Sequence, residues 1–207
     1  MHVCTWKGGV QVAGVDDVAA ALLIQTGPIT TMKLQKLVFY SQAWHLAFTS
    51  SPLFPETIQA WAQGPVVPEL HRQHRRKYEV ANWPSGQPDR LDSMERQTVG
   101  WVVEKYGGFS AEALSRMTHQ EVPWIVARGL AADGEKSSEP ISHDQMRAFY
   151  SRQRSDPEVA VAQAAANAAL EGRVIDDAWQ ETLRDIANGV RSADDVIVAE
   201  IERARRG

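Results

Sequence analysis

The run MKLQKLVFYSQAWHL, Met32–Leu46, decides the fold of the first part of this chain. Residues on one face of it recur at spacings of three and four, which predicts an amphipathic helix. Thr30 and Thr31 precede the run, and either can cap its first turn. That face comprises Leu34, Leu37, Val38, Ser41, Trp44 and Phe48, and Lys33, Lys36 and Gln42 lie off it.

A second segment, AWAQGPVVP at Ala60–Pro68, follows after a short loop. Residues 57–61 alternate polar and apolar side chains, as a short strand does. Gly64-Pro65 and Pro68 favour an extended path, because a residue that precedes proline avoids the helical region. A helix followed by a short extended element is therefore expected here.

Further helices are expected on both sides of these segments, since capping residues and Gly or Pro stops bracket apolar patterns. The predicted helices cover 15–26, 69–79, about 93–106, and short stretches around Leu114, Trp124 and 146–150. Asp92 or Ser93 is expected to open the helix at about 93–106. Ser110, Thr118 and Ser142 are each placed to cap one of the short helices, with Glu121 completing a capping box for Thr118. The predicted fold is mainly α with a small β element.

Composition narrows the class of protein. The 207 residues are 43% hydrophobic, which supplies a core and argues against wholesale disorder. The single cysteine, Cys4, fits a reducing compartment. No apolar run is long enough to span a bilayer, and the N-terminus does not resemble a signal peptide. A cytoplasmic protein is expected, and the net charge of −4 argues against binding nucleic acid along the whole chain.

Catalytic motifs are missing from the sequence. There is no glycine-rich phosphate loop, no serine nucleophile elbow and no cluster with metal-ligand spacing. His119 and Glu121 do not have the spacing of a zinc-binding helix, and a capping role explains them better. Trp44, Trp61 and Trp124 are expected mainly in the core. The sequence therefore predicts a protein that is not an enzyme and that uses no cofactor or metal.

Several motifs occur in the order found in one known family. They are the helix at 33–46, Pro52-Leu53-Phe54, the segment 60–68, and the run from Leu114 through Thr118-His119-Gln120-Glu121-Val122-Pro123-Trp124. Over about residues 15–150 the chain resembles the Panacea domain of SocA-like antitoxins. The resemblance implies a helical domain that neutralises a co-encoded toxin by direct binding. One branch of that family delivers its toxin to a protease, so a protease adaptor or a transcriptional regulator is the alternative.

The predicted helix at 69–79 is strongly basic. Arg72, Arg75, Arg76 and Lys77, with His71 and His74, form a positive stripe. Such a stripe can contact an acidic protein surface or phosphates, and equally it can be a solvated helix face. DNA binding has little support, because no helix-turn-helix or ribbon reader is recognisable.

A shift in composition near residues 152–157 divides the chain into predicted domains at 1–153 and 154–207. The second is Ala-rich and charged, and three helices are predicted at 157–170, 177–188 and 193–206, with Asp176 capping the second.

The run Asn167-Ala168-Ala169-Leu170-Glu171-Gly172, with the helices after it, resembles the VbhA family of antitoxins that inhibit Fic adenylyltransferases. The resemblance implies that Glu171 pairs with an arginine of the Fic ATP site, as a carboxylate can. Asn167 replaces the family's Ser or Thr. The alternatives are a helix that ends at Gly172 with Glu171 solvated, a dimerisation unit, or a toxin-binding tail. The predicted partner-binding residues are Asn167, Glu171, Gly172, Trp61, Gly64, Pro65, Arg72, Arg75 and Arg76, and the favoured partner is a Fic-type toxin.

Overall fold

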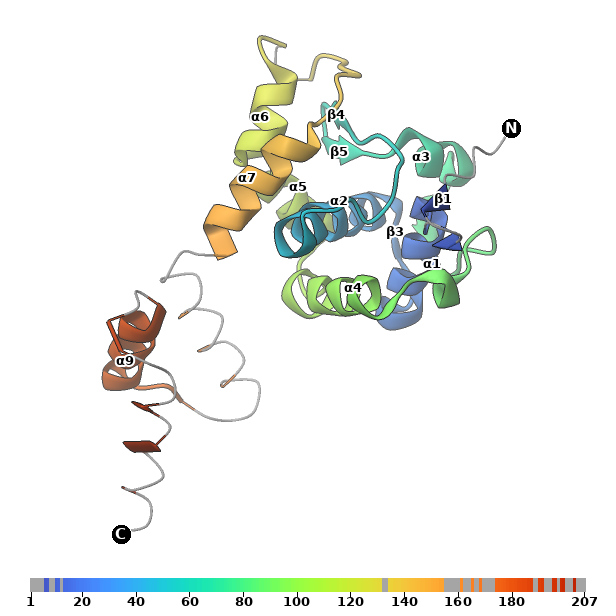
Figure 1. Ribbon diagram of the computed structural model, residues 1–207. Helices are drawn as coiled ribbons and strands as arrows, with labels where there is room; N and C mark the ends of the chain where they lie inside the picture. Colours follow the sequence, from blue (N-terminus) through green and yellow to red (C-terminus); the bar gives the residue numbers. More distant parts are fainter. Residues whose placement is uncertain are drawn as a thin grey trace. The chain divides into compact units, whose positions relative to one another are not determined.

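The computed structural model describes residues 6–7, 10–11, 13–131 and 134–154, and in the C-terminal part 161, 165, 168, 174–187, 190–191, 195–196, 198–199 and 203. The chain divides into two compact units, Met1–Tyr150 and Ser151–Gly207. The described part is mainly α, as predicted, with small two-stranded sheets (Figure 1).

Helices make up most of the first unit. They are α1 (Val15–Thr26), α2 (Thr31–Thr49), α3 (Pro68–His74), α4 (Ser93–Tyr106), α5 (Ala111–His119), α6 (Val122–Arg128) and α7 (His143–Arg154), which runs on into the second unit, together with the 3₁₀ turn η1 (Pro88–Arg90). Predicted caps are present at three of them. Thr30 accepts a hydrogen bond from Lys33 N, Asp92 from Glu95 N, and Ser110 from Ala113 N.

Three antiparallel pairs of short strands complete this unit. They are β1 (Trp6–Lys7) with β2 (Val10–Gln11), β3 (Ile29–Thr30) with β6 (Glu79–Val80), and β4 (Gln59–Trp61) with β5 (Gly64–Val66). The β4–β5 pair confirms the predicted extended element. The β3–β6 pair was not predicted, because two-residue strands carry no periodicity that a sequence pattern can reveal.

Helix α2 is the centre of the first unit, and α1, α4, α5 and β5 all pack against it. The prediction of a single apolar face is wrong, because every residue from Leu34 to Ala47 is buried. Polar side chains on the remaining faces are satisfied internally. Gln42 accepts from Leu53 N and Phe54 N and donates to Phe54 O, which fixes the loop before β4. The helix therefore carries its polar groups into the core.

Two other predictions are corrected. The basic helix ends at His74 rather than near residue 79, and Arg76 adopts a left-handed backbone with φ of 70°. Thr118 does not cap α6, because its hydroxyl is fully buried and donates to Ser115 O at 2.8 Å. The residue at the N-cap of α6 is Glu121, whose side chain makes no capping hydrogen bond.

In the second unit the structure describes helix α9 (Asp177–Ala187), where the expected cap is present: Asp176 Oδ1 accepts from Trp179 N at 2.8 Å. The predicted helices 157–170 and 193–206 lie largely outside the described residues. Among the helices that the structure describes, none combines the length and apolar character needed to cross a membrane.

Candidate functional site

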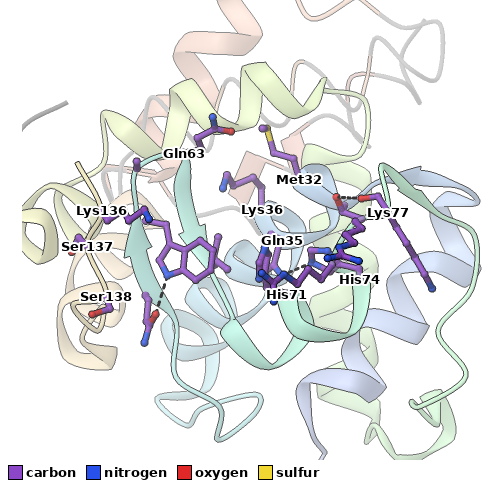
Figure 2. A pocket seen from close by; sticks show the side chains of 17 residues that line it. Met32, Gln35, Lys36, Gln63, His71, His74, Lys77, Lys136, Ser137 and Ser138 are labelled. Carbon is purple, nitrogen blue, oxygen red and sulfur yellow. Dashed lines mark hydrogen bonds between the residues drawn. The ribbon is translucent and has the colours of Figure 1, made fainter. Parts of the chain in front are cut away.

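A cavity of about 740 Å³ opens in the first unit among α2, α3, the β4–β5 pair and residues 136–138 (Figure 2). Its volume is in the range of small-molecule sites. The lining residues are Thr31, Met32, Gln35, Lys36, Gln59, Trp61, Ala62, Gln63, Val66, His71, His74, Arg75, Arg76, Lys77, Lys136, Ser137 and Ser138. None of these described residues is Asp or Glu, and five are Lys or Arg, so the residues of the lining whose side chains can carry charge are all basic.

Lys36 lies at the bottom of this cavity and is 1% exposed. Its Nζ donates to Pro65 O at 3.1 Å. Burial lowers the pKa of Lys36 to about 7, and no carboxylate raises it again. Because an ammonium group has three protons to donate, the hydrogen bond to Pro65 O leaves donor capacity that can be directed at a ligand.

The approach of Lys36 to β5 depends on Gly64. This residue has a φ of +96°, which side chains rarely tolerate. A Cβ at Gly64 would lie 2.7 Å from Lys36 Cε, and 2.8 Å from both Lys36 Nζ and Thr118 Oγ1. The Gly64-Pro65 step therefore supplies both the space and the carbonyl acceptor for the buried lysine.

Gln35 and His74 form a second polar contact at the base of the cavity. Gln35 Oε1 accepts from Val67 N at 2.8 Å, which orients the amide. Its Nε2 can then only donate to His74 Nε2, 2.9 Å away, so His74 is neutral in this arrangement. Burial and the nearby His71 and Lys77 lower the pKa of His74 in agreement with this.

Four exposed cationic residues belong to the cavity lining: Arg75, Arg76, Lys77 and Lys136. The segment that carries three of them is held at the N-terminus of α2, where Thr31 N donates to Tyr78 O and Thr31 Oγ1 donates to Lys77 O. The prediction that the basic residues form a stripe on one helix is therefore wrong, because α3 ends at His74. These four residues line a cavity and come from the turn after α3 and from a separate segment.

A buried carboxylate lies where α6 begins. Glu121 accepts hydrogen bonds from Tyr40 Oη at 3.1 Å and from Tyr150 Oη at 2.6 Å. Burial raises the pKa of Glu121 to about 7, although the two tyrosines and Lys105 counteract this. Tyr40 stacks on Tyr106 with 4.0 Å between ring centroids. Glu121 thus joins α2, α6 and α7 at the centre of an aromatic cluster.

Residues near Glu121 also support one wall of the cavity. Trp124 Nε1 donates to Trp61 O at 3.1 Å, which ties α6 to β4. His119 stacks on Trp124 with 4.2 Å between centroids. Among the described residues, no group of three or more His, Cys, Asp or Glu is placed to hold a metal ion. The role of Thr118–Trp124 that the structure shows is to hold the fold around the cavity.

The predicted partner-binding residues are distributed unevenly. Trp61, Arg75 and Arg76 line the cavity, and Gly64 and Pro65 form the β5 wall against Lys36. Arg72 lies outside the lining, exposed and 3.5 Å from Glu69. Asn167, Glu171 and Gly172 lie outside the described residues.

Sequence reasoning missed Lys36 and Lys136. A signal for Lys36 was present, because Leu37-Val38-Phe39-Tyr40 places apolar side chains around the full circumference of a helix. Such a helix is buried on all sides, so a lysine within it is buried as well. Lys136 belongs to an irregular segment without a pattern, and no comparable signal was available for it.

Residues 34–125 match the family model of the antitoxin SocA-like, Panacea domain. The match confirms the resemblance for a segment that contains most of α2, with α3, β4 and β5, whereas Thr31, Met32 and residues 136–138 of the cavity lining lie outside it. No curated protein and no solved structure matches the chain. The family suggests a role as an antitoxin and a toxin as partner.

Glu121 predicts a pH dependence of stability. Its pKa is about 7 in the folded protein against an ordinary 4.5, so between these values the folded state binds more protons than the unfolded state. The free energy of unfolding should therefore fall as pH rises from about 4.5 to 7, by roughly 3 kcal/mol from this group. Urea denaturation at pH 5 and pH 7.5 should show that the free energy of unfolding falls less between these pH values for Glu121→Gln than for the wild type. The exposed Glu112→Gln is the control. If the free energy of unfolding falls equally in both variants, Glu121 is not the source of the pH dependence.

Proposed function

We propose that this protein is an antitoxin that neutralises a co-encoded toxin in the cytoplasm by direct binding, without catalysis. The match of residues 34–125 to the SocA-like Panacea domain carries the proposal. The described residues that reproduce the family's motifs support it, because Gly64, Thr118 and Glu121 serve the architecture of the domain. None of them lies in an arrangement that resembles a hydrolytic or transfer site.

An apolar surface on α6 supports a protein partner. Val122, Ile125 and Val126 are 50%, 46% and 51% exposed, and Leu130 just beyond the helix is fully exposed. Their spacing places the three helical residues on one face. Contiguous exposed apolar side chains of this kind mark protein-binding surfaces more often than scattered single ones.

The direct test is expression of the neighbouring open reading frame with and without this chain. We expect the neighbour to arrest growth alone, to be tolerated when both are expressed, and to co-purify with the full chain. A harmless neighbour that does not bind would refute the proposal.

Substitution on α6 tests where the toxin binds. Ile125→Asp and Val126→Asp together should abolish co-purification and rescue, because two charges would be desolvated in an apolar contact. We expect a loss of affinity of at least about a hundredfold. Ile24→Asp is the matched control, because Ile24 is an exposed isoleucine on α1 at 74% exposure. Full rescue by the double variant, with unchanged thermal stability, would exclude α6 as the docking surface.

We further propose that the toxin is a Fic-type adenylyltransferase inhibited through Glu171. The support is the sequence Asn167–Gly172, followed by the capped helix α9. Glu171→Gly and Glu171→Gln should relieve inhibition of purified toxin, because each removes the carboxylate that competes for an arginine. Glu181→Gln, which removes an exposed carboxylate 3.0 Å from Arg184, is the control. Unchanged adenylylation with both Glu171 variants would exclude this mechanism and leave the antitoxin proposal to the growth assay.

A further inference from the structure

The cavity contains a buried lysine and further basic residues, which a contact with another protein does not require. A lysine that is 1% exposed lies at its base, and four further cationic residues that are exposed line it as well. Burying a lysine without a carboxylate partner is costly, and the described residues around the cavity supply none. The N-terminus of the 19-residue α2, with Thr31 and Met32 in the lining, adds the positive end of a helix dipole. All these features favour a bound anion.

We propose that the cavity binds a phosphate-bearing small molecule, for which nucleoside triphosphates and inorganic polyphosphates are the two sources of the same chemistry. This inference is independent of the toxin and of the antitoxin role. Lys36 would contact the innermost phosphate, and Arg75, Lys77 and Lys136 would contact the outer ones. Arginine suits this task because its planar group can donate two parallel hydrogen bonds to phosphate oxygens.

Charge density favours phosphate over the carboxylates of an acidic peptide. Each terminal phosphate group carries nearly two negative charges, whereas a peptide offers one carboxylate per acidic residue. Five cationic residues line a volume of about 740 Å³, which is suited to a compact ligand. The hydroxyls of Ser137 and Ser138 add hydrogen-bonding groups from the same side as Lys136 (Figure 2).

One wall of the cavity is apolar and suits the uncharged part of a ligand. Trp61 is half-buried, and Met32 and Val66 line the same space. Trp61 Nε1 donates to Gln59 Oε1 at 2.8 Å, and its ring meets His71 edge-on at 4.8 Å, so the indole is held in place. An aromatic ring fixed beside phosphate-binding cations can stack on a nucleobase.

Binding is tested on the full chain by isothermal titration calorimetry and thermal unfolding, at constant ionic strength. The probes are ATP, inorganic triphosphate and a hexaglutamate peptide. We expect both phosphates to bind and to raise the melting temperature, since a ligand that binds only the folded state stabilises it. Equal affinities would support recognition of the phosphate chain, and tighter binding of ATP would support a nucleotide. No binding of either phosphate, or equally tight binding of hexaglutamate, would overturn the proposal.

Variants locate the site. Arg75→Gln with Lys77→Gln removes two exposed cations of the cavity lining and should weaken phosphate binding about tenfold or more. Arg72→Gln is the matched control, because Arg72 is an exposed arginine of the same basic run outside the cavity lining. Equal losses in the control and the double variant would show general attraction to surface charge and would overturn the proposal.

Discussion

Gly64→Val is expected to destabilise the domain by about 4 kcal/mol. The backbone at Gly64 has a φ of +96°, which is strained for a β-branched residue. The added Cβ would also lie within 2.8 Å of Lys36 and of Thr118 Oγ1. The end of a lysine is flexible in general, but Lys36 is 1% exposed, and a movement away from β5 would break its hydrogen bond to Pro65 O.

The change is measured as the free energy of unfolding in urea. Gly108→Val is the matched control, because a Cβ at Gly108 meets nothing within 4 Å and its backbone is not left-handed. A Gly64 variant as stable as this control would show that Lys36 leaves its buried position at little cost. The close packing of α2 against β5 would then not be the reason for a glycine at this position.

Local chemistry in the sequence was sufficient to place many helix boundaries. Thr30, Asp92, Ser110 and Asp176 cap helices as predicted, because each accepts hydrogen bonds within its own first turn. Four consecutive residues of the sequence are enough to recognise a short polar side chain that can accept a hydrogen bond from a nearby backbone N–H group. Boundaries of this kind require no knowledge of the tertiary structure.

Contacts between distant residues were not predictable in this way. Glu121 fits a capping box, but Tyr40 and Tyr150, 81 and 29 residues away, bind its carboxylate instead. The turn after His74 fits a continued helix by composition, yet pairing of β6 with β3 draws the chain to the N-terminus of α2. In both places tertiary contacts override a local preference. The cavity depends on such contacts, which explains why its base at Lys36 was missed.

Lys36→Met is expected to stabilise the protein by about 4 kcal/mol at pH 6. Burial lowers the pKa of Lys36 from 10.5 to about 7, which corresponds to a cost of roughly 5 kcal/mol for burying the charge. The variant also loses the hydrogen bond to Pro65 O, which reduces the gain in stability by about 1 kcal/mol. Methionine fills a similar volume without a charge. If the protein becomes more stable when the buried charge of Lys36 is removed, this lysine serves a purpose other than folding.

The pH dependence separates this explanation from simple repacking. Below pH 7 the buried ammonium is charged in both states and its full cost is present. Between pH 7 and 10.5 the unfolded state binds more protons, so the wild type gains stability as pH rises. The advantage of Lys36→Met should therefore shrink from pH 6 to pH 10, whereas the exposed Lys77→Met should show no such trend. A variant less stable than the wild type at pH 6 would mean that Lys36 stabilises the fold through its bond to β5.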